Sequence, residues 1–261
     1  MLLYWFSPML QPLQSLLYQL LYRPIFNLLV FLYNIVPGHD FGVSIILLTV
    51  LLKLILYPVT SKTLSAQRQM QRLQPQVAKL QQQYKGQKEQ LSRELMALYQ
   101  REKVNPFSSC LPLLIQLPFL IAVYQVFING LRSSDSLQAL YPFVNNPGQL
   151  NAVAFGFLNL AQPNLVLAFL AGAAQFWQAK LAEVRRPAVH GGGAKDEDMA
   201  AAMSKQMLYM MPALTVFISA SLPAGLSLYW VAITLLTVGQ QYLMARPKQP
   251  SPIPNIVSSG K

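Results

Sequence analysis

Lys53 is the residue whose type and setting most strongly indicate chemistry, because it is a cation inside an otherwise apolar segment. A charge at the centre of a bilayer costs roughly 2.5–3.5 kcal/mol, so an intramembrane lysine indicates function by default. Its long side chain could instead extend the ammonium to nearby headgroups, which would be a purely structural arrangement. Thr49 lies one helical turn earlier on the same face. Since no Asp or Glu occurs in any apolar segment, the charge of Lys53 should face water or an acidic group of another molecule.

Three further apolar segments carry polar side chains that share one helical face. Taken singly, each would be an interhelical hydrogen bond worth about 0.6 kcal/mol. Together with the face of Lys53 they indicate a water-filled cavity inside the protein. The candidate lining residues in these segments are Gln175, Gln178, Thr215, Trp230 and Thr234, and Thr237 and Gln241 continue the stripe of Trp230.

The composition excludes several other classes of chemistry. Hydrophobic residues make up 53% of the 261 residues and charged residues 11%, whereas a soluble domain carries about 25% charged residues. The single cysteine, Cys110, excludes a disulfide framework. With only His39 and His190, a Cys/His zinc site is not expected. No nucleotide-binding loop occurs. The sequence predicts neither an enzyme nor a bound cofactor.

The apolar segments are long enough to cross a bilayer as helices. A hydrocarbon core of about 30 Å requires about 20 helical residues. The predicted fold is therefore an all-α polytopic membrane protein with a core of residues 41–245. It contains five transmembrane helices, which are expected at residues 41–59, 107–129, 164–181, 207–222 and 225–244.

The N-terminal segment, residues 1–40, contains a further apolar stretch at Leu13–Val36. Polar positions recur in it every four residues, at Gln19, Arg23 and Asn27. An amphipathic helix that lies in the membrane interface accounts for this pattern. A sixth span or an uncleaved signal anchor is the alternative interpretation.

The basic residues are distributed very unevenly between the two sides of the predicted spans. Seventeen of the twenty lie in the loop 62–103, in the segment 180–205 or after Met244. The positive-inside rule therefore places the N terminus outside and the C terminus in the cytoplasm. The net charge of +11 is thus explained by topology and does not require DNA as a partner. Loops this basic could still contact ribosomal RNA or anionic lipid.

The first basic loop has the pattern of two amphipathic helices. Within residues 61–104, apolar side chains recur at helical spacing over Leu73–Tyr84, and the same stripe resumes after Gly86. The sequence therefore predicts a cytoplasmic helical hairpin that turns at Gly86. This hairpin either packs only on itself or serves as a docking arm for a cytosolic partner or a lipid surface.

Two other segments are predicted to lie in the cytoplasm. The loop 183–205 contains three consecutive glycines and a run of acidic residues, and we expect it to be mobile. The tail, residues 246–261, is short and rich in proline, and offers little surface for holding a ribosome.

Several motifs together resemble YidC-type membrane protein insertases, the Oxa/YidC/Alb family. The resemblance covers about residues 16–245, and its motifs occur in the family's order. The large extracytoplasmic domain of Gram-negative members has no counterpart, so the chain resembles the short form. The motifs are the run from Ser44 to Thr60, Leu73-Gln74-Pro75, Leu98-Tyr99, Val104-Asn105-Pro106, Leu111-Pro112, Gln116, Pro118-Phe119, Pro223, Gly225, Tyr229-Trp230 and Gln240-Gln241.

The resemblance implies five core helices around a hydrophilic groove that opens to the cytoplasm and to lipid. A single positive residue, usually Arg, lies in this groove, and Lys53 stands at its position here. If the family's pattern is transferred to this sequence, the other groove residues are Thr49, Gln178, Tyr229 and Trp230. The implied function is that of an insertase and chaperone in the bacterial plasma membrane. The implied partners are nascent membrane-protein clients, the ribosome, the signal recognition machinery, the Sec translocon and the lipid bilayer.

The same residues bear on three other possible functions. A small-solute transporter or channel could use Lys53 as an anion site, but it should show paired half-helices or an inverted repeat, which the sequence lacks. An assembly factor that folds membrane proteins without translocating them is not separable from an insertase by sequence. An intramembrane Ser/His hydrolase is excluded, because both histidines lie outside the apolar segments.

Overall fold

A computed structural model describes residues 15–16, 18–105, 111–130, 134–182 and 195–244 of the chain. Helices dominate this part, with a π-helical turn at Tyr18–Tyr22 and 3-10 turns at Pro37–His39 and Ser134–Ala139. The α-helices and strands are α2 (Arg23–Ile35), α3 (Phe41–Ile55), α4 (Tyr57–Gln83), α5 (Lys88–Arg101), α6 (Leu111–Gly130), β1 (Val153–Ala154), β2 (Leu158–Asn159), α7 (Leu165–Ala182), α8 (Lys195–Ser221) and α9 (Ala224–Met244).

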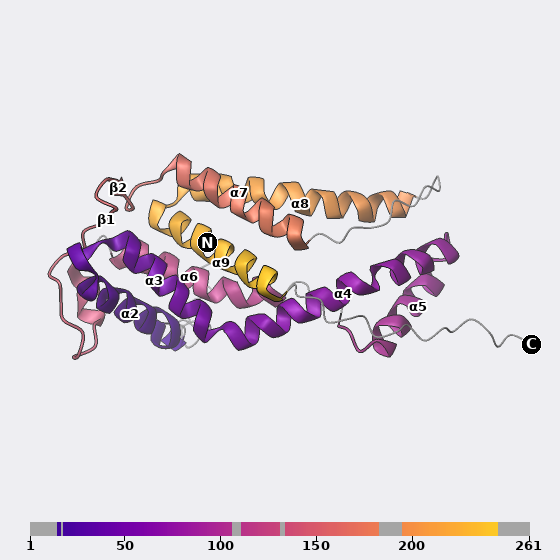
Figure 1. Cartoon of the computed structure of the whole chain (residues 1–261), viewed down its shortest axis with the longest axis horizontal. Coiled ribbons are helices and arrows are strands. Elements are labelled where there is room, and N and C mark those ends of the chain that lie inside the picture. Colours follow the sequence, from indigo (N-terminus) through magenta and orange to yellow (C-terminus); the bar gives the residue numbers. More distant parts are fainter. Residues whose placement is uncertain (1–14, 17, 106–110, 131–133, 183–194, 245–261) are drawn as a thin grey trace, which may run out of the picture.

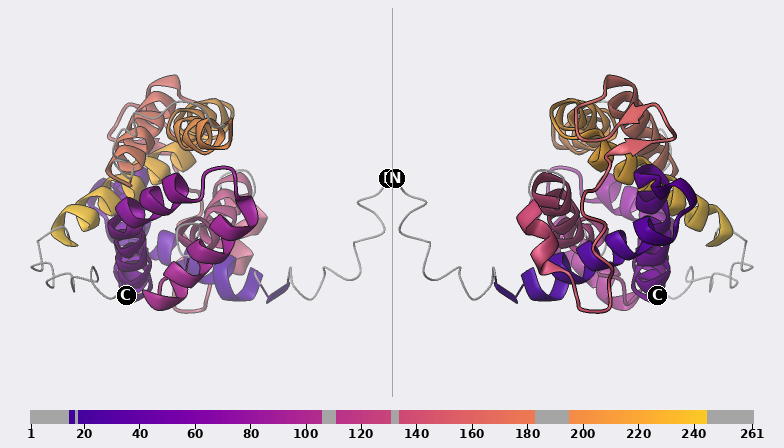
Figure 2. Two further views of the ribbon diagram at one scale, coloured as in Figure 1. Left: turned by 90° about the vertical axis from the view of Figure 1, so that its right-hand side faces the viewer. Right: turned by 90° about the vertical axis from the view of Figure 1, so that its left-hand side faces the viewer.

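The helices form an elongated bundle with α9 in the middle (Figure 1). α7 packs against both α8 and α9, and α3 packs against α9 and α2. Seen end-on, the pair α7–α8 lies to one side of α9, and α2, α3 and α6 lie to the other (Figure 2). The hairpin of α4 and α5 extends from one end of the bundle, and β1 and β2 lie at the opposite end (Figure 1). Because α9 contacts α3, α6 and α7, its side chains can join the two sides of the bundle.

Close helix contacts hold this bundle together. Phe41 of α3 and Phe127 of α6 are buried and meet edge to face, with ring centroids 5.9 Å apart. Gly225 packs so tightly on that contact that an added Cβ would lie 2.4 Å from Cε1 of Phe127. An added Cβ on Gly172 of α7 would lie 2.3 Å from Cγ2 of Val216 on α8. Small residues at such contacts are typical of membrane bundles, in which close packing associates the helices.

The N-terminal helix is present, but part of its polar face is turned toward the protein. Asn27 is only 3% exposed, and its amide donates to the carbonyl of Ala139 at 3.1 Å. Nε of Arg23 donates to the same carbonyl at 3.1 Å, and its guanidinium lies over the ring of Tyr141. Asn27 therefore does not face the headgroups, because its side chain bonds to the backbone that follows α6. The interfacial position of the helix as a whole stays a prediction.

The first predicted span, residues 41–59, is not one straight helix. α3 ends at Ile55 and α4 begins at Tyr57, with a bend of 69° between them. Pro58 explains the break, because a proline in a continuous helix lacks an amide donor and clashes with the carbonyl four residues earlier. By length and composition, no single helix in the described ranges suffices to cross a membrane, and α3 and α4 pass that test only as a bent pair.

Two amphipathic helices occupy the range of the predicted cytoplasmic hairpin. α4 and α5 pack against each other, and Gly86 between them has a φ of +80°, which glycine adopts without strain. Leu73 and Val77 on α4 and Leu98 on α5 are buried, as the apolar stripe requires. The turn between the two helices therefore includes Gly86, as the sequence predicted.

The predicted mobile loop, residues 183–205, is partly helical. Residues 183–194 lie outside the described part of the chain, and residues 195–205 form the beginning of α8. The second half of the expected loop is therefore helical, and the mobility of the segment stays a prediction. Ala and Met residues, which favour helices, replace the glycines there and extend α8 beyond the apolar segment.

Candidate functional site

Lys53 reaches from α3 to α9, where it meets a hydroxyl group. Its half-buried side chain places Nζ 2.9 Å from Oγ1 of Thr237. Oγ1 of Thr237 donates its own proton to the carbonyl of Ile233 at 2.7 Å, which leaves its lone pairs for the ammonium. The partner of the cation is thus a neutral acceptor, and its charge is not compensated by this contact.

The α9 face that carries Thr237 continues to Trp230, two helical turns earlier. Nε1 of Trp230 donates to Oε1 of Gln175 on α7 at 3.4 Å. Gln178 lies three residues further along α7, and it is half-buried like Gln175 and Trp230. We refer to Lys53, Thr237, Trp230 and Gln175 as the Lys53 cluster, which spans α3, α9 and α7.

The other expected lining residues lie deeper in the protein. Thr49, Thr215, Tyr229 and Thr234 are all buried. The hydroxyls of Thr49 and Thr215 donate to backbone carbonyls one turn earlier, those of Ile45 at 2.6 Å and Met211 at 3.0 Å. Of the eight residues expected to line a groove, the structure therefore leaves partly accessible only Lys53, Gln175, Gln178 and Trp230.

Tyr229 joins α9 to α6. Its phenol oxygen accepts a hydrogen bond from Nε2 of Gln116 at 2.7 Å. Gln116 is one of the few polar residues in a mostly apolar helix, so this bond gives a specific register between α6 and α9.

α9 is also bonded to α4 close to the bend. Nε2 of the buried Gln240 donates to Oγ1 of Thr60 at 3.2 Å and to Oγ of Ser61 at 3.3 Å. These contacts lie one turn beyond Thr237. The start of α4 and the end of α3 are thus fixed against the same face of α9.

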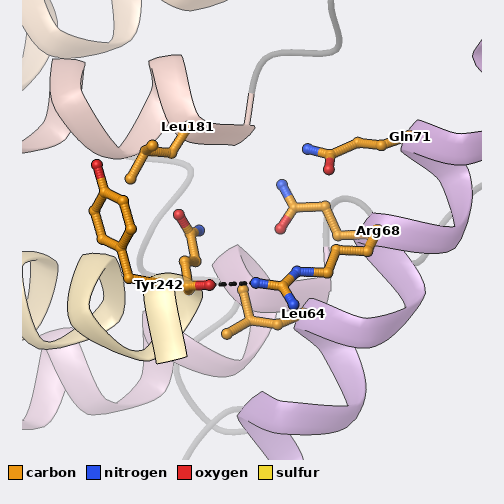
Figure 3. A pocket seen from close by; sticks show the side chains of 7 residues that line it. Leu64, Arg68, Gln71, Leu181 and Tyr242 are labelled. Carbon is orange, nitrogen blue, oxygen red and sulfur yellow. Dashed lines mark hydrogen bonds between the residues drawn. The ribbon is translucent and has the colours of Figure 1, made fainter. Parts of the chain in front are cut away.

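Arg68 makes the last of these contacts, at the end of α9. Its guanidinium donates to the backbone carbonyls of Gln241 and Met244, and the dashed line in Figure 3 marks the bond to Gln241. A cation suits this position, because the last carbonyls of a helix are unpaired and carry partial negative charge. Burial, together with the nearby charge of Arg72, lowers the pKa of Arg68.

A pocket of about 180 Å³ opens beside Arg68, between α4, α7 and α9 (Figure 3). Oε1 of Gln241 lines it and is buried without a hydrogen-bond donor among the described residues. Its lining residues are Leu64, Gln67, Arg68, Gln71, Leu181, Gln241 and Tyr242.

The sequence alone did not single out all of these contacts. Thr237 lies on the same helical face as Trp230, but the sequence does not identify it as a site residue. Its pattern gives no indication that it contacts Lys53. Gln116 was noted in α6, and its pairing with Tyr229 joins positions 113 residues apart. Arg68 carried no local signal, because its role depends on where the end of α9 lies.

Comparison with known proteins gives one consistent result. The model of the family described as 60Kd inner membrane protein matches residues 31–251 of the chain. A protein of Fusobacterium nucleatum subsp. nucleatum named membrane protein insertase YidC is 35% identical over 230 residues, covering 87% of this chain and 97% of that protein. The protein of the same name from Clostridium tetani is 35% identical over 214 residues, covering 82% of this chain and 85% of that protein.

A solved structure shares the fold. It is described as an active YidC insertase crystal structure with the first transmembrane domain resolved. The two chains are 26% identical with a TM-score of 0.52, and the match covers 87% of this chain. It covers 47% of the other, so this chain spans about half the length of that structure.

Proposed function

Because the chain belongs to the 60Kd inner membrane protein family, the family of YidC-type membrane protein insertases, we propose that it inserts client proteins by way of the Lys53 cluster. The clients are nascent membrane proteins with a short polar tail that must cross the bilayer. The tail enters a hydrophilic groove, open to the cytoplasm, that is formed between the core helices α3, α6, α7, α8 and α9. The apolar segment of the client moves sideways into lipid.

The observation that carries this proposal is the contact of Lys53 with a neutral hydroxyl. A cation bonded to Thr237 Oγ1 keeps its full charge available for an acidic group that arrives from outside. A carboxylate partner would have cancelled that charge. The half-buried position of Lys53, between α3 and α9, supports access by a client from the groove.

The cost of moving an acidic residue through the bilayer is similar in size to its attraction to a nearby lysine. Moving one Asp or Glu of the client through the bilayer costs roughly 2.5–3.5 kcal/mol. A cation about 4 Å away contributes about 4 kcal/mol at an effective dielectric constant near 20. One lysine can therefore offset about one acidic residue, and water in the groove weakens the attraction enough for release. Partitioning of the client's apolar segment and the membrane potential, worth about 2.3 kcal/mol per charge per 100 mV, supply the driving force.

The proposed setting is the bacterial plasma membrane, with the N terminus outside and the C terminus in the cytoplasm. The basic hairpin α4–α5 then lies in the cytoplasm, where the ribosome, the signal recognition machinery and the Sec translocon are candidate partners. A solute transporter with Lys53 as an anion site is the alternative, and the names of the relatives favour insertion over it.

The test is an insertion assay in proteoliposomes with a single-span client whose translocated tail carries one Asp. We expect Lys53→Ala to lower insertion of this client about tenfold or more, which corresponds to about 1.4 kcal/mol, and Lys53→Arg to restore it. The same client with Asn in place of Asp should be much less sensitive to Lys53→Ala. Lys62→Ala, which removes an exposed cation of α4, is the matched control and should insert both clients normally. Unchanged insertion of the Asp client by Lys53→Ala would remove the proposed role of the cation.

A further inference from the structure

The turn between β1 and β2 exposes large aromatic side chains at one end of the molecule. Phe157 is 81% exposed and Phe155 44% exposed. Phe143, in the segment that precedes the strands, is 77% exposed and stacks on Tyr141. Single exposed apolar residues are ordinary, whereas several large ones at one end of a molecule indicate a contact surface.

The backbone of this turn is unfavourable for the residue that occupies it. Phe155 has a φ of +54°, and Gly156 after it has a φ of +79°. Asn, Asp or Gly is the usual choice at such a position, and a bulky residue is an outlier there. An aromatic side chain in a left-handed conformation costs stability, and such outliers are typical of functional positions.

The exposed turn is nevertheless held firmly by the rest of the fold. The amide of Phe155 donates to the carboxylate of Asp40, which also accepts from the amide of Val43 at the start of α3. Ala154 is fully buried, and its Cβ would lie 2.5 Å from a Cβ added to Gly42. Cε2 of Phe155 would lie 3.3 Å from the same added Cβ, so this ring packs partly on the start of α3, whereas Phe157 remains 81% exposed.

The surroundings of the turn favour lipid as the contact partner. No charged residue occurs between Asp135 and Lys180. α7 begins a few residues after the turn, and its first residues, Leu165 and Val166, are 64% and 68% exposed. The exposed aromatic turn and the exposed apolar start of α7 thus follow one another along an uncharged chain.

We propose that the β1–β2 turn inserts Phe155 and Phe157 into the interfacial layer of the bilayer leaflet opposite the α4–α5 hairpin. Aromatic rings favour this layer, because it is apolar on one side and hydrated on the other. The turn is bonded to the start of α3, so its insertion fixes the depth and tilt of the helix that carries Lys53. This inference rests on the membrane position contained in the proposed function, and it does not require the charge of Lys53.

Single-cysteine fluorescence tests this contact. The only cysteine, Cys110, is replaced by Ser, and Phe157→Cys is labelled with an environment-sensitive fluorophore in vesicles of zwitterionic lipid. Gln149→Cys is the control, since Gln149 is exposed in the same uncharged loop. We expect the label at 157 to be blue-shifted, quenched by lipids with a quencher near the headgroup, and several-fold less sensitive to aqueous iodide than the label at 149. Ionic strength should change these values little, because zwitterionic lipid has no net charge to attract the protein and the contact is apolar.

Two outcomes would overturn the inference. One is equal quenching by iodide at 157 and 149. The other is protection of the label at 157 that disappears when the protein is diluted in excess lipid, which would indicate a second copy of the chain as the partner. Insertion by these variants and by Lys53→Ala is measured in parallel, so that failure of the turn to bind lipid is distinguishable from failure of the insertion mechanism.

Discussion

The polar residues of the bundle differ in the kind of hydrogen-bond partner that they have, and that partner indicates their role. Thr49 and Thr215 bond to their own helices and are buried, so they contribute to packing. Tyr229 bonds to Gln116 and fixes a helix register. Lys53 differs from these, because its partner Thr237 leaves a net positive charge at the contact.

The hydrogen bond between Tyr229 and Gln116 should stabilise the bundle measurably. Tyr229→Phe removes the phenol oxygen and leaves the Gln116 amide without this acceptor, so the free energy of unfolding should fall by about 1 kcal/mol. Tyr242→Phe, which removes an exposed phenol from the same helix, should change it little. The measurement is denaturant unfolding in detergent. Equal effects of both variants would contradict the assignment.

At the residue scale the sequence singled out Lys53 as a candidate site residue but did not identify its hydrogen-bond partner. A lysine in an apolar segment stands out from its neighbours, so the candidate site could be recognised without a structure. Thr237 is 184 residues away, and its contact depends on which face of α9 packs on α3. Helical periodicity shows which residues share a face, but it does not show which helix lies opposite.

At the scale of helices, close approach sets the positions of α7 and α8. Gly172→Ala should lower the free energy of unfolding by about 1–3 kcal/mol, because the new Cβ meets Val216 and overpacks the contact. Gly239→Ala in α9 should raise it by up to about 1 kcal/mol, since nothing lies within 4 Å of the added Cβ and alanine favours a helix. Denaturant unfolding in detergent measures both. The same sign for the two variants would contradict the packing described here.

Arg68 should control the end of α9. In Arg68→Gln the carbonyls of Gln241 and Met244 lose their donor, so hydrogen exchange at the amides of residues 240–244 should rise several-fold. Arg72→Gln removes an exposed cation one turn later and should leave this exchange unchanged. Hydrogen exchange with mass-spectrometric detection gives both values. A rise of similar size in the two variants would show that general charge, and not this contact, protects α9.

Element boundaries followed from the sequence where local chemistry sets them. The turn at Gly86 and the limits of α7 and α9 agree with the pattern to within one residue or so. The bend between α3 and α4 was missed, because an uninterrupted apolar run concealed the effect of Pro58. The orientation of Asn27 was also missed, since a buried polar residue and a headgroup-facing one give the same four-residue period.

At the scale of the whole molecule, the two ends differ in the number of basic residues that they carry. The α4–α5 hairpin carries most of the basic residues of the first loop, and the end with β1 and β2 lies in an uncharged stretch of chain (Figure 1). The Lys53 cluster lies in the bundle between these ends, on the α9 face that α3 and α7 flank. Under the proposed function, a client would enter from the basic end and pass Lys53 on its way to the lipid.

The most direct test of the Lys53 cluster as the client site is photo-crosslinking from α9. A photoreactive phenylalanine derivative replaces either Trp230, in the cluster, or Leu235, which is 44% exposed on another face of the same helix. The client is a stalled nascent chain with one Asp in its tail. We predict crosslinks at 230 and few at 235, with the yield at 230 reduced by Lys53→Ala for the Asp tail but not for an Asn tail. Equal crosslinking yields at both positions, or a yield at 230 that Lys53→Ala does not change for the Asp tail, would contradict the account.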